Sequence, residues 1–141
     1  MKNRPEVGVS TAVFRDGRVL LAQRATGALL GLWSLPGGRV EHGETMADAA
    51  LRELEEEVQV KADIIDLAGI VEVLPQGPDE TFHFVVMAFA ATWREGEPQV
   101  GPEAAGIVWA DPTTLDDLPV TKDLHRIVAQ AAALVAQKVA L

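Results

Sequence analysis

The sequence predicts an α/β fold in which helices cover both faces of a mixed β-sheet, an α/β/α sandwich. Segments rich in β-branched and apolar residues alternate with two segments, 46–58 and 124–135, whose apolar residues recur at helical spacing. In the strand-like run 81–91, apolar side chains occupy both faces, which is typical of a central strand between helical layers. With 141 residues, 48% of them hydrophobic, the chain is expected to form one domain, 1–141, around a substantial core.

Strands joined by glycine-containing turns are expected before the first helix. Residues 7–14 and 19–23 are rich in strand formers, and Asp16-Gly17 between them is a hairpin turn signal. The remaining elements expected here are a loop at 24–31, a short strand at 32–35 and a sharp turn at Pro36-Gly37-Gly38.

The first helix is predicted over 46–58 and carries a cluster of carboxylates. Thr45 and Asp48 have the spacing of an N-terminal capping box, which fixes the start of the helix. Three carboxylates share one helical face at i, i+3 and i+4, namely Glu53, Glu56 and Glu57. Like charges this close repel and raise each other's pKa, so a cation is expected among them, and Mg²⁺ or Mn²⁺ is the obvious candidate.

The second half of the chain alternates strands and loops before a last helix. Residues 60–74 indicate one or two strands, 81–91 a further strand and 107–110 a short one. Prolines and glycines predict a polar loop over 93–106. The apolar stripe of residues 124–135 predicts a final helix that closes one side of the sheet.

Residues 38–60 resemble the signature of the Nudix hydrolases, G-x5-E-x7-R-E-U-x-E-E-x-G-U, where U is a bulky aliphatic residue. The matching positions are Gly38, Glu44, Arg52, Glu53, Leu54, Glu56, Glu57 and Val60. The late glycine of the signature, which lets a left-handed residue end the helix, is Gln59 in this chain. A non-glycine in that conformation costs roughly 1 kcal/mol. Either the backbone is slightly strained at Gln59 or the helix exits along a different path.

The resemblance implies a Nudix-type sandwich around a mixed, curved sheet, and hydrolysis of a pyrophosphate bond that joins a nucleoside diphosphate to another group. It also implies Mg²⁺ or Mn²⁺ as the cofactor and an orienting role for Arg52, with Glu44 in the same network. The implied metal ligands are Gly38, through its carbonyl, and Glu53, Glu56 and Glu57, and the implied catalytic set is these three glutamates with Arg52. The glutamate that takes a proton from water stays open, because the base differs within the family.

Three residues outside the signature are expected to contact the substrate. Arg24 can bind a phosphate through two parallel hydrogen bonds, or be a surface arginine. Trp33 lies just before the glycine turn and either stacks on a base or packs in the core. Glu103 lies in the expected polar loop and is either a solvent-facing carboxylate or, as a late glutamate is in some relatives, a further metal ligand or the general base.

ADP-ribose, cleaved to AMP and ribose 5-phosphate, is the expected substrate. Pro75 lies close to where the family's ADP-ribose pyrophosphatases often carry a proline, and the chain lacks the tyrosine that marks many dinucleoside-polyphosphate hydrolases. The stretch LWSLPGG also resembles MutT-type enzymes, so hydrolysis of a modified nucleoside triphosphate to the monophosphate and pyrophosphate stays open. A non-catalytic nucleotide-sensing module is a further alternative, disfavoured because such modules usually lose carboxylates of the signature.

Charge and composition limit the class of partner. The net charge of −9 disfavours nucleic acid and leaves a small nucleotide whose phosphates are bridged by metal ions. Neither a signal peptide nor a membrane span is indicated, because no long uncharged apolar run occurs, and a cytoplasmic protein is expected. The absence of cysteine excludes disulfides and thiolate metal sites. A homodimer is compatible with the resemblance, because many ADP-ribose-cleaving members are homodimers.

Overall fold

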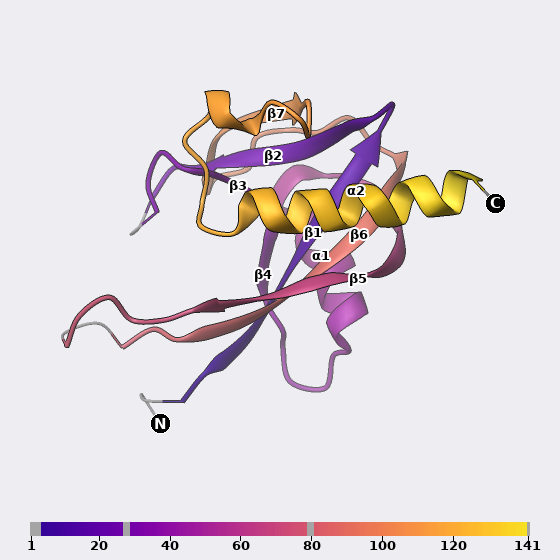
Figure 1. Cartoon of the computed structure of the whole chain (residues 1–141). Coiled ribbons are helices and arrows are strands. Elements are labelled where there is room, and N and C mark those ends of the chain that lie inside the picture. The colour runs from indigo at the N-terminus through magenta and orange to yellow at the C-terminus, as the bar shows by residue number, and fades with distance from the viewer. Residues whose placement is uncertain (1–3, 27–28, 79–80, 141) are drawn as a thin grey trace.

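A computed structural model describes residues 4–26, 29–78 and 81–140, and Figure 1 shows the arrangement of the chain. Its elements are, in chain order, β1 (Glu6–Arg15), β2 (Arg18–Arg24), β3 (Trp33–Ser34), β4 (Gly37–Arg39), α1 (Met46–Val58), β5 (Lys61–Val73), β6 (Phe84–Glu95), β7 (Ala104–Ala110), the 3-10 turn η1 (Leu115–Asp117) and α2 (Leu124–Ala140). Each strand and helix expected from the sequence is present, although several begin or end elsewhere than predicted.

The predicted hairpin is formed by β1 and β2. Asp16 and Gly17 connect the strands with φ angles of 52° and 79°. Two successive residues with positive φ are typical of the turn that follows the right-handed twist of paired strands. Phe14 pairs with Val19 directly beside this turn.

The sheet is mixed and curved, as predicted. β1 runs parallel to β6 along nearly its whole length, and β6 pairs antiparallel with β5. The opposite edge of β1 is shared, first by β4 and then by β2. β2 in turn pairs with β7 along one edge and with β3 along the other. The sheet therefore divides beyond β1, and the Gly37–Arg39 segment lies in the fork.

Two local predictions were wrong. The expected turn at 36–38 is largely strand β4, which pairs with Gly8–Ser10 of β1. A Cβ on Gly37 would come within 2.9 Å of the Ser10 Cα, so glycine is what allows this close pairing. The loop expected at 93–106 is confined to 96–103, because β6 continues to Glu95 and β7 begins at Ala104. Strand pairing with β5 and β2 extends both strands into a segment whose prolines and glycines favoured a loop.

The helices α1 and α2 cover opposite faces of the sheet, which confirms the predicted sandwich. In Figure 1, α2 crosses in front of the sheet and α1 lies behind it. Side chains of β1 alternate between the two cores: Val13 packs with Leu54 of α1, and Phe14 packs with Val128 of α2. Within the described residues, neither helix combines the length and hydrophobicity needed to cross a membrane.

The bounds of α1 agree with the prediction, Met46 to Val58. At the N-terminus the Thr45 hydroxyl accepts a hydrogen bond of 3.1 Å from the Asp48 amide. At the C-terminus Gln59 is left-handed, with φ 60° and ψ 37°, and its N–H donates to the Glu55 carbonyl. Of the two alternatives for Gln59, the structure therefore supports the strained helix end.

Replacing Gln59 by glycine should stabilise the protein. The change removes a Cβ from a left-handed residue, and the net gain expected is a few tenths to about 1 kcal/mol after the larger unfolded-state entropy of glycine is subtracted. Denaturant melts measure it, with Gln59→Ala as the control that keeps the Cβ and should bring no gain. A loss of stability in Gln59→Gly would show that the left-handed backbone carries no strain.

Candidate active site

Two carboxylates of α1 lie against the glycine backbone of β4. The Glu57 Oε2 accepts a hydrogen bond of 2.9 Å from the Gly37 amide. A Cβ on Gly38 would overlap the carboxylate of Glu53. The two glycines therefore have different tasks: Gly37 supplies a backbone donor, and Gly38 leaves the space that the Glu53 carboxylate occupies.

The backbone of β4 directs Gly37 and Gly38 to opposite sides. Successive residues of a strand point their N–H and C=O groups alternately to either edge. The Gly37 amide faces Glu57 rather than β1, so its carbonyl also lies on the α1 side. Gly38 pairs with Val9 of β1, and a Cβ on Gly8 of the same strand would lie 3.3 Å from the Gly38 carbonyl oxygen. The carbonyl that faces α1 is therefore that of Gly37, not that of Gly38 as predicted.

Arg52 is the centre of a hydrogen-bond network beside these carboxylates. Its Nε and Nη2 donate to the two oxygens of Glu44, at 2.7 and 3.0 Å. Its Nη1 donates to Glu53 at 3.0 Å and to Glu56 at 3.2 Å, and Nη2 also donates to the Arg39 carbonyl. The expected contacts of Arg52 with Glu56 and Glu44 are thus present. This guanidinium fixes the orientation of Glu53 while Glu44 fixes the guanidinium.

The network separates the carboxylates into two electrostatic classes. Hydrogen bonding by Arg52 lowers the pKa of Glu44 to about 2, and Glu44 in turn raises the pKa of Arg52. Burial raises the pKa of Glu53 and that of Glu57, against the opposing effects of Arg52 on the first and the Gly37 amide on the second. Glu44 therefore stays ionised down to low pH. Burial disfavours the ionised forms of Glu53 and Glu57, so a nearby positive charge would stabilise these two carboxylates.

The low pKa of Glu44 predicts how the stability of the folded protein depends on pH. Its pKa falls from 4.5 to about 2 on folding, so the folded protein binds fewer protons than the unfolded chain between these values. The stabilisation by this pair is therefore complete above the ordinary pKa and is lost as the pH falls towards about 2. As the pH is lowered, carbon-detected NMR of the glutamate carboxyls should show that Glu44 is protonated last. Arg52→Met should return the pKa of Glu44 towards 4.5. An ordinary pKa for Glu44 in the unmodified protein would contradict the network.

Arg24, at the end of β2, and Glu103, the residue before β7, are brought to the same site. The Ala25 amide donates to the Glu103 carbonyl at 3.0 Å, and Arg24 pairs with Ala104. Both charges act on Glu57: Arg24 lowers the pKa of that carboxyl and Glu103 raises it. The Nε of Arg24 is buried and has no hydrogen-bond partner among the described residues. Arg24 itself is only half-buried, and a guanidinium with an unused donor is suited to a phosphate oxygen.

Trp33 follows Leu32, whose carbonyl accepts from the Arg24 amide, but its side chain lies on the other face of the sheet from α1. Its indole packs against the core cluster on the α2 face of the sheet, whereas Glu53 and Glu57 come from α1. A Cβ on Gly106 would lie 3.2 Å from the indole, and the Trp33 backbone is held by Pro119 and Thr121. These contacts favour the core interpretation of Trp33 over base stacking.

The three signature glutamates do not converge as tightly as predicted. Glu56 is 60% exposed and turns towards Arg52. Within the described part of the chain, no three acidic or histidine side chains are arranged so that they could hold a metal ion. The physical reason is that different donors hold them: Glu57 accepts from the Gly37 amide, whereas Glu53 and Glu56 both accept from the Nη1 of Arg52. The Glu53 and Glu57 carboxylates and the Gly37 carbonyl are nonetheless hard oxygen donors, the kind that Mg²⁺ and Mn²⁺ prefer.

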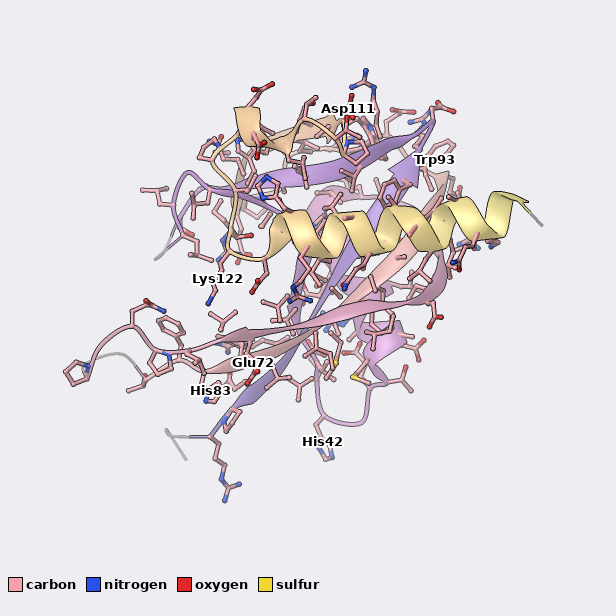
Figure 2. All side chains as sticks on the ribbon, viewed as in Figure 1. His42, Glu72, His83, Trp93, Asp111 and Lys122 are labelled. Carbon is pink, nitrogen blue, oxygen red and sulfur yellow. The ribbon has the colours of Figure 1, made fainter. Side chains whose placement is uncertain are left out.

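The sequence singled out Glu103 in the expected loop but did not predict that the 96–103 segment packs against the end of α1. The Gln99 amide donates to the Val58 carbonyl at 3.0 Å, and a Cβ on Gly101 would lie 2.7 Å from the Glu57 carbonyl oxygen. The Gly37 amide was also missed, although the glycine doublet before the signature was a signal for it. Figure 2 shows His42 on the loop before α1, pointing away from the body of the protein.

Comparison with known proteins decides the family. The NUDIX domain model matches residues 4–131. The chain belongs to the Nudix family. This Nudix chain is 34% identical to the MutT NUDIX hydrolase from Burkholderia pseudomallei, whose crystal structure superimposes with a TM-score of 0.79 over 90% of this chain and 98% of that one. The Nudix-type fold expected from the signature is therefore confirmed.

Two sequence relatives carry more specific names. The ADP-ribose pyrophosphatase of Methanocaldococcus jannaschii is 30% identical over 115 residues, which cover 82% of this Nudix chain and 65% of the relative. The RNA pyrophosphohydrolase of Erythrobacter litoralis is 49% identical over 53 residues, which cover 38% of this chain and 32% of the relative. The match thus spans less than two thirds of either relative's length.

Proposed function

We propose that this protein hydrolyses the pyrophosphate bond of a nucleoside diphosphate linked to another group, with a divalent metal ion as cofactor. The observation that carries this proposal is the placement of Glu53 and Glu57 against the Gly37-Gly38 backbone, where a single helix face meets a backbone carbonyl. Such a site holds two carboxylates and one neutral oxygen donor, and its charge is suited to Mg²⁺ or Mn²⁺.

The proposed ligands are Glu53, Glu57, Glu103 and the carbonyl of Gly37, with Glu56 joining after it leaves Arg52. When bound, the metal ions would neutralise the diphosphate and lower the pKa of an attacking water. Arg24 is proposed to bind a phosphate oxygen through its unused Nε–H. Arg52 holds Glu53 in the orientation that a ligand or a general base requires.

ADP-ribose is the proposed substrate and AMP and ribose 5-phosphate the proposed products. The relative named ADP-ribose pyrophosphatase, Pro75 and the absence of tyrosine support this choice. Residues 75–80 are proposed to select the terminal ribose. Pro75 begins this segment, two residues after the end of β5, and its last residues, 79 and 80, lie outside the described residues. A nucleoside triphosphate is the second candidate, supported by the similarity to a protein named MutT NUDIX hydrolase.

A substrate panel compared by kcat/KM tests this proposal. The panel contains ADP-ribose, NADH, dinucleoside polyphosphates, and normal and oxidised nucleoside triphosphates, each with Mg²⁺ and with Mn²⁺. ADP-ribose should be preferred and should yield AMP and ribose 5-phosphate. A preference of ten or more for an oxidised triphosphate, worth about 1.4 kcal/mol, would replace ADP-ribose while keeping pyrophosphate hydrolysis. Tight nucleotide binding without hydrolysis of any compound would support a sensing module instead.

A further inference from the structure

The 96–103 segment packs against the C-terminal end of α1. The Gln99 amide donates to the Val58 carbonyl, which gives the last turn of the helix one hydrogen-bond partner, and Gly101 packs against the Glu57 carbonyl. The final residue of the segment, Glu103, is fixed by the bond from the Ala25 amide to its carbonyl. The distance between the Glu103 and Glu57 carboxylates therefore depends on how this segment is seated.

Arg15 contacts the first residues of the same segment. Its guanidinium lies 3.7 Å from the centroid of the Trp93 ring and 5.9 Å from that of Trp109. The same group forms a 3.0 Å ion pair with Glu97. The Trp93 indole N–H donates to the Gly96 carbonyl at 2.8 Å. Figure 2 shows Trp93 beside the C-terminal end of β1. Arg15 of β1, Trp93 of β6 and Trp109 of β7 thus meet at one corner, next to the 96–103 segment.

We infer that Arg15 is a positioning residue for Glu103: by stacking on Trp93 and pairing with Glu97 it seats the 96–103 segment on the end of α1. This inference rests on the proposed function, because it takes Glu103 to be part of the metal site. Arg15, the last residue of β1, lies outside the signature, and the inference gives it a role in metal affinity.

The chemistry of the corner requires an arginine. An exposed ion pair contributes little by itself, and Glu97 is 73% exposed. A planar guanidinium can stack on an indole and donate to a carboxylate at once, whereas a lysine ammonium has neither the flat face nor the fixed donor geometry. Arg15 is 29% exposed, so the indoles screen its charge from solvent and hold the pair in one orientation.

The test is a double-mutant cycle read out as the Mn²⁺ dissociation constant by calorimetry. Arg15→Met should weaken Mn²⁺ binding by about tenfold, the size typical of residues that orient metal ligands. In a Glu103→Gln background the same substitution should have almost no effect, because the residue through which Arg15 acts has lost its charge. Arg94→Met, which breaks an ion pair with Asp63 next to Trp93, is the matched control and should leave Mn²⁺ binding unchanged.

Two further measurements distinguish a change in the packing of the 96–103 segment on α1 from a general loss of stability. Amide exchange of Gln99 in the metal-free protein should be faster in Arg15→Met than in Arg94→Met, whatever the substrate is. Glu97→Gln removes only an exposed ion pair, so it should fold normally and weaken Mn²⁺ binding in the same direction by a smaller factor.

The outcomes distinguish the two proposals. Equal weakening by Arg15→Met in both backgrounds, or unchanged exchange at Gln99, would overturn the positioning role and leave the metal site intact. Non-saturable Mn²⁺ binding by the unmodified protein would instead overturn the proposed function, and the inference with it.

Discussion

Glu57→Gln should lower turnover by about 10³-fold, or about 4 kcal/mol of transition-state stabilisation, and leave the fold intact. The glutamine keeps an oxygen that can accept from the Gly37 amide, so the local structure survives. It removes the charge that a divalent cation needs. Burial raises the pKa of Glu57, so the neutral side chain should also leave stability unchanged or slightly higher. Initial rates at saturating Mg²⁺, with a denaturant melt of each protein, measure both effects.

Glu55→Gln is the matched control for this substitution. Glu55 lies on the same helix two residues earlier, is exposed and pairs only loosely with Lys61 at 4.0 Å. The chemical change is identical, so turnover should stay within about twofold of the unmodified protein, as surface changes usually have small effects. Near-normal turnover of Glu57→Gln would remove Glu57 from the proposed site.

Gly38→Ala should lower kcat/KM by about 10²-fold with little loss of stability. The added methyl would overlap the Glu53 carboxylate, which is the end of a flexible side chain and can move aside. Moving a reacting or ligating group by about 1 Å costs a factor of this size. The Arg52–Glu53 bond should break at the same time, because the carboxylate leaves its present position.

The neighbouring substitution Gly37→Ala provides the contrast. Its methyl would meet the backbone of Val9 and Ser10, which cannot move aside without shifting β1. We expect a loss of stability of about 1–3 kcal/mol, the usual cost of overpacking. Thermal melts and kcat/KM of both alanine variants check the pair. A normal kcat/KM for Gly38→Ala would show that Glu53 need not occupy the space beside that glycine.

Local signals in the sequence were sufficient for the hairpin and for α1. The Asp16-Gly17 turn has the positive φ angles that this pair favours, and Thr45 caps α1 at the expected residue. The left-handed conformation of Gln59 was one of two alternatives left open, and the structure selects it. These features depend on residues close together in the chain, where propensity and periodicity carry information.

Features that depend on distant partners were not predictable. β4 exists because Gly37–Arg39 finds Gly8–Ser10, and β6 extends to Glu95 because β5 pairs with it. The signature placed Glu53, Glu56 and Glu57 on one helix face, but the donors that hold them depend on how Arg52 and the Gly37 amide are placed in space. The same holds for Arg15, whose partners come from three other segments of the chain.

The central claim is that the face of α1 carrying Glu53 and Glu57 binds a divalent metal against β4. A calorimetric Mn²⁺ titration of the unmodified protein and of the double variant Glu53→Gln/Glu57→Gln tests it without reference to any substrate. Saturable binding in the unmodified protein and its loss in a folded double variant is the expected result. Equal Mn²⁺ affinity in the two proteins would contradict the claim.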